Sequence, residues 1–294
     1  MALKVQDLYL TLQRLGLKGG DAVLLYASDS FARSLEGGAA SVVAAAMYAI
    51  QPSGTLVCQC KHPSRAADPT YSVSDYLCSL HDSVVSSHPL YPVAAIGQMA
   101  SEITSGHEKC HPFGRNSPFH RLYKSKAKLL LAGAEQSANT LVHLAEEMAR
   151  LPYLDRSEPV GTTHASGRDS VVWVRKSGCR AGFGVVDELM EENADTLESG
   201  FGQFRIRTIG VREIIDTTLG LLSIDHEALL CDNPTCEACA EARAMISAVE
   251  AEQQDNEIVQ LSEEEERTRI NVEKRLQTGR VQHFERHAGD TSLN

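Results

Sequence analysis

Residues 128–151 decide the fold, and they read KLLLAGAEQSANTLVHLAEEMARL. The apolar run 128–132 fits a buried β-strand, and Gly133 opens a polar turn after it. The apolar residues that follow return every three or four positions, which predicts a helix over 140–151 with Asn139 as its N-cap. The predicted buried stripe of this helix consists of Leu141, Leu144, Ala145 and Met148.

The same alternation of strand and helix appears in the first sixty residues. Apolar positions spaced by three and four residues predict an amphipathic helix over 4–16. The runs 21–28 (DAVLLYAS) and 55–58 (TLVC) fit buried strands, and 41–50 (SVVAAAMYAI) fits a helix between them. Strands that alternate with helices predict a single α/β/α sandwich domain with a mostly parallel central sheet.

The second half of the chain is less regular. It predicts strands over 170–175 and 204–209, an acidic helix over 187–199 and a further helix over 211–222. Residues 249–274 hold nine carboxylates against three basic residues, and their apolar positions have no regular spacing. We expect a domain over 1–248 and a dispensable acidic tail, helical or disordered, over 249–294. The alternative is a tail helix that packs against a second copy and makes a homodimer.

The composition excludes several classes of protein. The net charge of −11 argues against a nucleic-acid partner and favours a neutral or cationic ligand. No stretch approaches the ~20 apolar residues of a membrane span, and no secretory signal is visible, so a cytoplasmic location is expected. The GxGxxG and GxxxxGK[ST] nucleotide motifs are missing from the sequence.

The eight cysteines, in a chain without a secretory signal, are expected to be free thiols or metal ligands instead of a disulfide framework. Cys236 and Cys239 form a CxxC pair, which supplies two of the four ligands of a structural zinc. Either Cys231 or the pair Cys110 and His111 would complete the site. The alternative is a pair of free thiols at the start of a helix.

His143 is the first candidate for chemistry. It falls in the first helical turn, off the apolar stripe, where the helix dipole disfavours imidazolium and so favours a neutral base. Glu146 and Glu147 follow at distances of three and four residues, close enough for one of them to orient the ring. Ligands of α/β sheets bind beyond the carboxyl ends of strands, where this turn would lie. The alternative is a histidine on the helix surface with no role.

Three other features are weaker candidates. His88 precedes a proline at a strand end or in a loop, and Asp68 precedes a proline in a turn. Gly37 and Gly38 precede a helix, where backbone N–H groups can hold a phosphate.

An ordered series of short segments over residues 1–246 adds a resemblance. The clearest segment is 133–146, which ends NTLVHLAE. The others are 17–21 (LKGGD), 35–38 (LEGG), 52–57 (PSGTLV), 68–69 (DP), 88–89 (HP), 93–95 (VAA), 112–114 (PFG), 117–118 (SP), 121–123 (RLY) and 152–153 (PY). In this order and spacing, the chain resembles the aminoglycoside 3-N-acetyltransferases.

The resemblance implies an α/β/α enzyme that moves an acetyl group from acetyl-CoA to an amine, in antibiotic resistance. His143 would be the general base, with Asn139 and Glu146 around it. The residues implied to hold CoA are Ser28, Asp29, Ser30, Gly37, Gly38 and Thr140. Asp68, Glu146 and His88 are the candidates that would face a cationic acceptor.

The chain also departs from the family pattern. Many relatives read His-Ser-Ser where this chain has Tyr26-Ala27-Ser28, and many have a second histidine and a serine where it has Tyr91-Pro92. Two alternatives therefore stay open: an acyltransferase for a different amine in a biosynthetic pathway, and an inactive relative that serves as a binding protein.

Overall fold

The computed structural model describes residues 4–60, 68–154, 157–163, 169–175, 178–192 and 196–253, with single positions at 263, 266, 267 and 270. Residues 1–243 and 244–294 form two units. Within the described residues, no helix combines the length and apolar character needed to cross a membrane.

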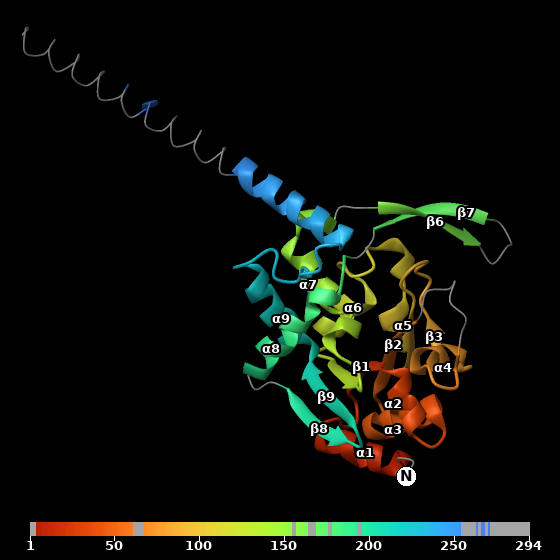
Figure 1. Cartoon of the computed structure of the whole chain (residues 1–294). Helices are drawn as coiled ribbons and strands as arrows, with labels where there is room; N and C mark the ends of the chain where they lie inside the picture. The colour runs from red at the N-terminus through yellow and green to blue at the C-terminus, as the bar shows by residue number, and fades with distance from the viewer. Residues whose placement is uncertain are drawn as a thin grey trace, which may run out of the picture. The chain divides into compact units, whose positions relative to one another are not determined.

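The first unit is built on a seven-stranded sheet of order β3-β4-β2-β1-β5-β9-β8 (Figure 1). Its strands are β1 (Ala22–Ala27), β2 (Thr55–Gln59), β3 (Val84–Val85), β4 (Val93–Gly97), β5 (Lys128–Ala132), β8 (Leu197–Phe201) and β9 (Phe204–Gly210). Strand β1 pairs in parallel with β2 on one side and with β5 on the other. A separate hairpin joins β6 (Ser157–Thr163) to β7 (Asp169–Arg175).

The predicted mostly parallel sheet is wrong, because the sheet is mixed. Among the described strands of this sheet, only the pairs β1–β2 and β1–β5 are parallel, and the pairs β2–β4, β3–β4, β5–β9 and β8–β9 are antiparallel. The two residues Gly202 and Gln203 join β8 to β9, and a connection this short can only make an antiparallel hairpin. The acidic helix expected over 187–199 is also too long. Helix α8 spans Val185–Glu192, and the last part of the predicted range belongs to β8.

Helices cover both faces of the sheet. On one face, side chains from alternate strand positions, including Val23, Leu25 and Leu130, form one buried core with residues of the four helices α1, α2, α3 and α4. Leu24 in β1 and its pairing partner Leu129 in β5 occupy the intervening positions and are fully buried on the other face. There, α5 contacts β2 and β4, and α9 contacts β9. The helices are α1 (Val5–Arg14), α2 (Asp29–Ser34), α3 (Gly38–Ile50), α4 (Val73–Ser79), α5 (Ala100–Thr104), α6 (Pro118–Lys124), α7 (Val142–Ala149), α8 and α9 (Val211–Leu222). Short 3-10 turns are η1 (His107–Lys109), η2 (Gln136–Ala138), η3 (Pro152–Leu154) and η4 (Ala181–Gly184).

Several predicted elements are confirmed at or near their bounds. Strand β5 and helix α9 match the predicted ranges, and α1 and α3 differ from theirs by a few residues. Helix α7 is shorter than predicted, and Met148, placed on its buried stripe, is 37% exposed.

The second unit is described only in part. A helix over 237–253 supplies its described residues 244–253. The expected tail over 249–294 lies largely outside the described residues, so its predicted dispensability stays a prediction.

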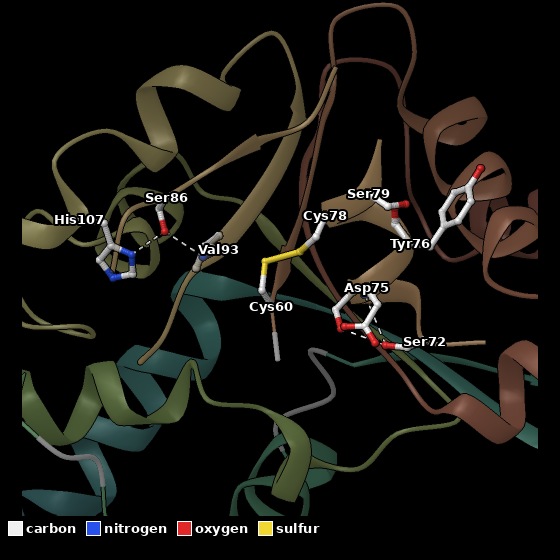
Figure 2. The surroundings of a disulfide bond; sticks show 10 residues. Cys60, Ser72, Asp75, Tyr76, Cys78, Ser79, Ser86, Val93 and His107 are labelled. Carbon is white, nitrogen blue, oxygen red and sulfur yellow. Dashed lines mark hydrogen bonds between the residues drawn. A yellow bond between two sulfur atoms is a disulfide. The ribbon is translucent and has the colours of Figure 1, made fainter. Parts of the chain in front are cut away.

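Two cysteines form a disulfide, which the sequence reasoning did not expect. Cys60 follows β2 and bonds to Cys78 in α4, eighteen residues later (Figure 2). Helix α4 packs against β2 and β4, and this packing brings the two thiols together. The other six cysteines are free thiols.

Candidate active site

The carboxyl ends of the three parallel strands meet at one edge of the sheet. Tyr26 is near the end of β1, Gln59 ends β2, and Thr140 lies in the loop after β5. The Thr140 hydroxyl is 2.7 Å from the Tyr26 hydroxyl and donates to the Gln59 side-chain oxygen. Burial raises the pKa of Tyr26, so this hydroxyl stays protonated. The edge therefore has an ordered polar network that includes Thr140, which the resemblance implies as a CoA contact, and Gln59, which the sequence did not single out.

His143 is the second residue of α7 and is buried, with 1% of its surface exposed. It is therefore not a surface histidine, although its place in the first turn is as predicted. Its Nδ1 lies 2.5 Å from a carboxylate oxygen of Glu146. Its ring contacts Phe113 and Phe183, with centroid distances of 4.9 Å to each. Aromatic contacts and a hydrogen-bonding partner thus fix the orientation of the imidazole.

Glu146 links this histidine to a third residue. Its other carboxylate oxygen accepts a 2.6 Å hydrogen bond from the Tyr153 hydroxyl. Burial, followed by the charge of Glu146, raises the pKa of Tyr153, so the tyrosine remains a donor. We call His143, Glu146 and Tyr153 the buried triad. Among the described residues, Nε2 of His143 has no hydrogen-bonding partner although it is buried.

Asn139 supports the entry to α7, but not as its N-cap. The helix begins at Val142 after Leu141, and no side chain caps it. The Asn139 amide oxygen accepts from the Leu141 N–H at 3.0 Å, and its amide nitrogen donates to Gln136 at 2.8 Å. Asn139 is fully buried, so it holds the shape of the turn that leads to His143.

His88 is also buried, and it lies beside a histidine that the sequence did not single out. Its ring centroid is 4.6 Å from that of His107. The two N–H groups of Leu90 and Tyr91 donate to Nδ1 of His88. Burial and the charge of His107 lower the pKa of His88 to about 3, so its ring is neutral at neutral pH.

His107 is held at both ring nitrogens. Nδ1 lies 2.8 Å from the Ser86 hydroxyl, as Figure 2 shows, and Nε2 donates to the Pro112 carbonyl at 3.1 Å. Burial lowers the pKa of His107 to about 4. The ring of Tyr91 continues the aromatic contacts to Phe113, 5.0 Å away, and so to His143.

The residues expected to hold CoA lie in two turns of the same sheet edge. Ser28 follows β1 and caps α2 by accepting the Phe31 N–H, and its hydroxyl is 3.0 Å from that of Ser30. Asp29 is the first residue of α2. Gly37 and Gly38 have φ values of 85° and 61° at the start of α3.

Glycine is required at position 38, because a Cβ there would lie 2.3 Å from the Thr70 carbonyl oxygen. Asp68 lies two residues before Thr70, at the start of the turn that faces Gly38. Its carboxylate accepts the Thr70 N–H at 3.2 Å and lies 3.8 Å from Arg33. No contact in the described part of the chain joins Asp68 to the buried triad.

The CxxC pair is completed by cysteines from two other segments. The ligand atoms of four residues lie within 4.8 Å of one another, and we call this set the four-cysteine cluster: Cys179, Cys231, Cys236 and Cys239. Cys231 was one predicted partner, whereas Cys179 was not predicted. Cys110 and His111 are not part of the cluster. The Cys110 thiol contacts the His107 carbonyl, and His111 lies 3.4 Å from Glu147.

Comparisons with known proteins identify the family of the chain. The sequence profile of the family described as aminoglycoside 3-N-acetyltransferase matches residues 24–223. Aminoglycoside N(3)-acetyltransferase IV from Salmonella sp is 31% identical over 229 residues, which cover 73% of this chain and 85% of that protein. Aminoglycoside N(3)-acetyltransferase VII from Streptomyces paromomycinus is 30% identical over 183 residues, which cover 51% of this chain and 63% of that protein.

Solved structures show the same fold. The apoenzyme of aminoglycoside acetyltransferase AAC(3)-IVa is 30% identical with a TM-score of 0.73, over 84% of this chain and 98% of that one. A histidine-to-alanine mutant of that enzyme in complex with a gentamicin has a TM-score of 0.74 at 29% identity, with the same coverage. AAC-IIIb, in a binary complex with CoASH, shares the fold at 19% identity with a TM-score of 0.68, over 76% of this chain and 97% of that one. Because the family profile spans most of the chain and the type IV enzyme is similar along most of its length, the chain belongs to the aminoglycoside 3-N-acetyltransferase family and is an aminoglycoside N(3)-acetyltransferase-like enzyme.

Proposed function

We propose that the enzyme transfers the acetyl group of acetyl-CoA to the 3-amino group of an aminoglycoside, with His143 as general base. The observation that carries this proposal is the unsatisfied Nε2 atom of His143. A buried polar atom without a partner is costly and calls for an explanation, of which a catalytic role is one. A substrate amine beside Nε2 would supply the missing partner.

The buried triad fits the proton transfer. The carboxylate of Glu146 accepts a hydrogen bond from Nδ1–H, and this tautomer leaves the lone pair of Nε2 free to take a proton from the amine. As the amine nitrogen bonds to the thioester carbonyl carbon, that proton moves to Nε2. Glu146 stabilises the imidazolium, and Tyr153 holds the other carboxylate oxygen in place. The C–S bond then breaks, and the imidazolium returns the proton to the CoA thiolate.

Asn139 acts in this proposal through the backbone, because its side chain fixes the turn that precedes His143. A small displacement of a base is enough to reduce proton transfer, since catalysis depends on the distance to the reacting atom. Thr140 would contact CoA from the polar network that it forms with Tyr26 and Gln59.

CoA would lie along the two turns at the carboxyl edge of the sheet. Residues 28–30 and the pair Gly37 and Gly38 begin α2 and α3 there, and exposed backbone N–H groups at helix starts suit a phosphate or an amide of CoA. The CoASH complex of a family member supports the choice of donor. These contacts remain part of the proposal.

The acceptor is proposed from charge and from relatives. The type IV enzyme was crystallised with a gentamicin and with apramycin, at 29% and 28% identity to this chain. The net charge of −11 favours a polycationic sugar. Glu146 would not touch the acceptor directly, because its carboxylate is occupied by His143 and Tyr153. His88 is proposed to contribute to acceptor binding through Tyr91, whose ring it contacts. Asp68 is proposed to contribute from the turn that contains Thr70.

The test is a CoA-release assay with a panel of aminoglycosides, other amines and a control without acceptor. We expect release that depends on an aminoglycoside, with the 3-amino group acetylated when the product is examined by NMR. Turnover with another amine but with no aminoglycoside would refute the acceptor and retain acetyl transfer. Absence of turnover with every amine, together with no binding of acetyl-CoA by calorimetry, would refute the function itself.

A further inference from the structure

We propose that the four-cysteine cluster binds one structural zinc ion. The CxxC pair alone supplies two ligands; Cys231 adds a third from the loop just before the pair, and the fold brings in Cys179 from a segment distant in sequence. The proposal does not depend on the identity of the acceptor or on the role of His143.

The positions of the sulfur atoms match a tetrahedral site. A zinc ion with Zn–S bonds of about 2.3 Å places its four sulfurs about 3.8 Å apart. The Sγ atom of Cys231 lies 3.8 Å from that of Cys179 and 3.5 Å from that of Cys239, and all four sulfurs lie within 4.8 Å. These separations are too long for disulfides, whose bond is about 2.05 Å. They are also too short to leave room for the bridging sulfides of an iron–sulfur cluster.

The backbone around the sulfurs is arranged as in thiolate metal sites. The Cys231 N–H donates to Sγ of Cys239, and the Ala181 N–H donates to Sγ of Cys179, both at 3.4 Å. Such N–H to sulfur bonds orient thiolate ligands and offset their negative charge. Arg243 donates to the Cys231 carbonyl at 3.0 Å, which fixes the loop that carries this ligand.

Zinc is the ion that this ligand set favours. Four sulfur ligands around a single ion indicate zinc or iron, and zinc stands above ferrous iron in the order of affinities. Four protein ligands leave no open position for substrate, so the ion would be structural and not catalytic.

A zinc ion here would tie down the segment that supports the buried triad. Residue 178 packs on Tyr153, since a Cβ at Gly178 would lie 3.6 Å from that ring. Turn η4 begins two residues after Cys179 and holds Phe183 against His143. The backbone of η4 also lies close to the loop before Cys231, because a Cβ at Gly182 would meet the Leu229 carbonyl oxygen at 2.4 Å. The ion would join these two segments to the CxxC pair.

The first measurement uses the full-length chain, purified on a tag that binds no metal and without chelator. Elemental analysis should find about one zinc per chain, by the four-ligand count. After zinc is exchanged for Co(II), the absorption spectrum should show the visible bands of a tetrahedral ion and a thiolate-to-cobalt charge-transfer band. Metal-free protein, iron in place of zinc, or a Co(II) spectrum without thiolate bands would overturn the proposal.

The second measurement compares variants. Cys179→Ser and Cys236→Ser should each lower the zinc content at least tenfold, whereas the matched control Cys110→Ser should keep it. Equal loss in Cys110→Ser would contradict this ligand set, as would peptide mapping that finds a disulfide within the cluster. If the ligand variants do not fold, the Co(II) spectrum of the unaltered chain still decides.

Discussion

Replacement of Glu146 by glutamine would keep the shape of the contact to His143 and remove its negative charge. The two side chains are both 1% exposed and meet at 2.5 Å, so solvent screens their interaction only weakly. The amide oxygen of glutamine can still accept the hydrogen bond from Nδ1–H, and its NH2 group, which replaces the second carboxylate oxygen, can donate to the Tyr153 hydroxyl. The variant therefore tests the charge of the triad and not its packing.

The size of the effect follows from the geometry. Proton transfer to Nε2 creates an imidazolium about 4 Å from the carboxylate charge, and at an effective dielectric constant of about 20 this attraction amounts to about 4 kcal/mol. The dipole of the amide retains part of it, so we expect the transition state to lose about 2–3 kcal/mol. Each 1.36 kcal/mol is tenfold in rate, so kcat should fall about 30- to 150-fold.

The assay is steady-state release of CoA with acetyl-CoA and an aminoglycoside, with kcat and both KM values measured. Glu147→Gln is the matched control, since it makes the same change one residue later on α7, and its kcat should stay within about twofold of the parent, as for a charge outside the reaction. The KM for acetyl-CoA should be unchanged in Glu146→Gln. A kcat that is unaltered in Glu146→Gln, in protein with a normal melting temperature, would refute the role of the carboxylate.

Three further outcomes are expected. His143→Ala should lower kcat by about 10²- to 10⁴-fold, the range typical of a lost general base, with little change in acetyl-CoA affinity by calorimetry. The free energy of unfolding should fall as the pH drops below about 6.5, by up to about 1.4 kcal/mol per pH unit for each of His88 and His107. The reason is that the unfolded chain binds protons on these histidines below that pH, whereas in the folded chain their pKa values are lowered to about 3 and about 4. A chain that ends at Ala248 should keep its melting temperature and its turnover.

Each of these has a clear contrary result. An unchanged rate in His143→Ala would remove this residue from the mechanism. Denaturant unfolding at a series of pH values measures the pH dependence of the free energy of unfolding. Equal stability at pH 7 and pH 5 would contradict the neutral, buried state of His88 and His107. Its control is His81→Gln, which removes a histidine with an exposed side chain and should leave the slope unchanged. A tail truncation that melts several degrees lower, or that converts a dimer to a monomer on a sizing column, would show that the tail is structural.

Much of the fold could be predicted because local patterns specify it. The apolar run of β5 and the three- and four-residue spacing in α9 each define an element without help from the rest of the chain. The direction of the strands could not be predicted in this way. A buried apolar strand such as β4 has the same pattern whether it runs parallel or antiparallel to β2, and its direction depends on the connections around it.

The site was predictable where its residues are neighbours in sequence. His143 and Glu146 are three residues apart on a helix, so their contact follows from helix geometry. Tyr153 and Phe183 reach the same place through turns and long-range packing, and no spacing rule connects them to His143. Cys179 is 52 residues from Cys231, and only the three-dimensional fold shows that it completes the cluster.

The order of the strands in the sheet has a consequence for synthesis of the chain. Strand β1 ends at Ala27, but its neighbour β5 begins only at Lys128, and the next neighbour β9 begins at Phe204. Pairings between such distant segments close long loops, and proteins dominated by them fold slowly. On the ribosome, β5 and the turn that leads to His143 would emerge long before β9 is available to cover their edge. Such an uncovered strand edge is a site for aggregation, so yield during expression should depend on how quickly the nascent chain supplies β9.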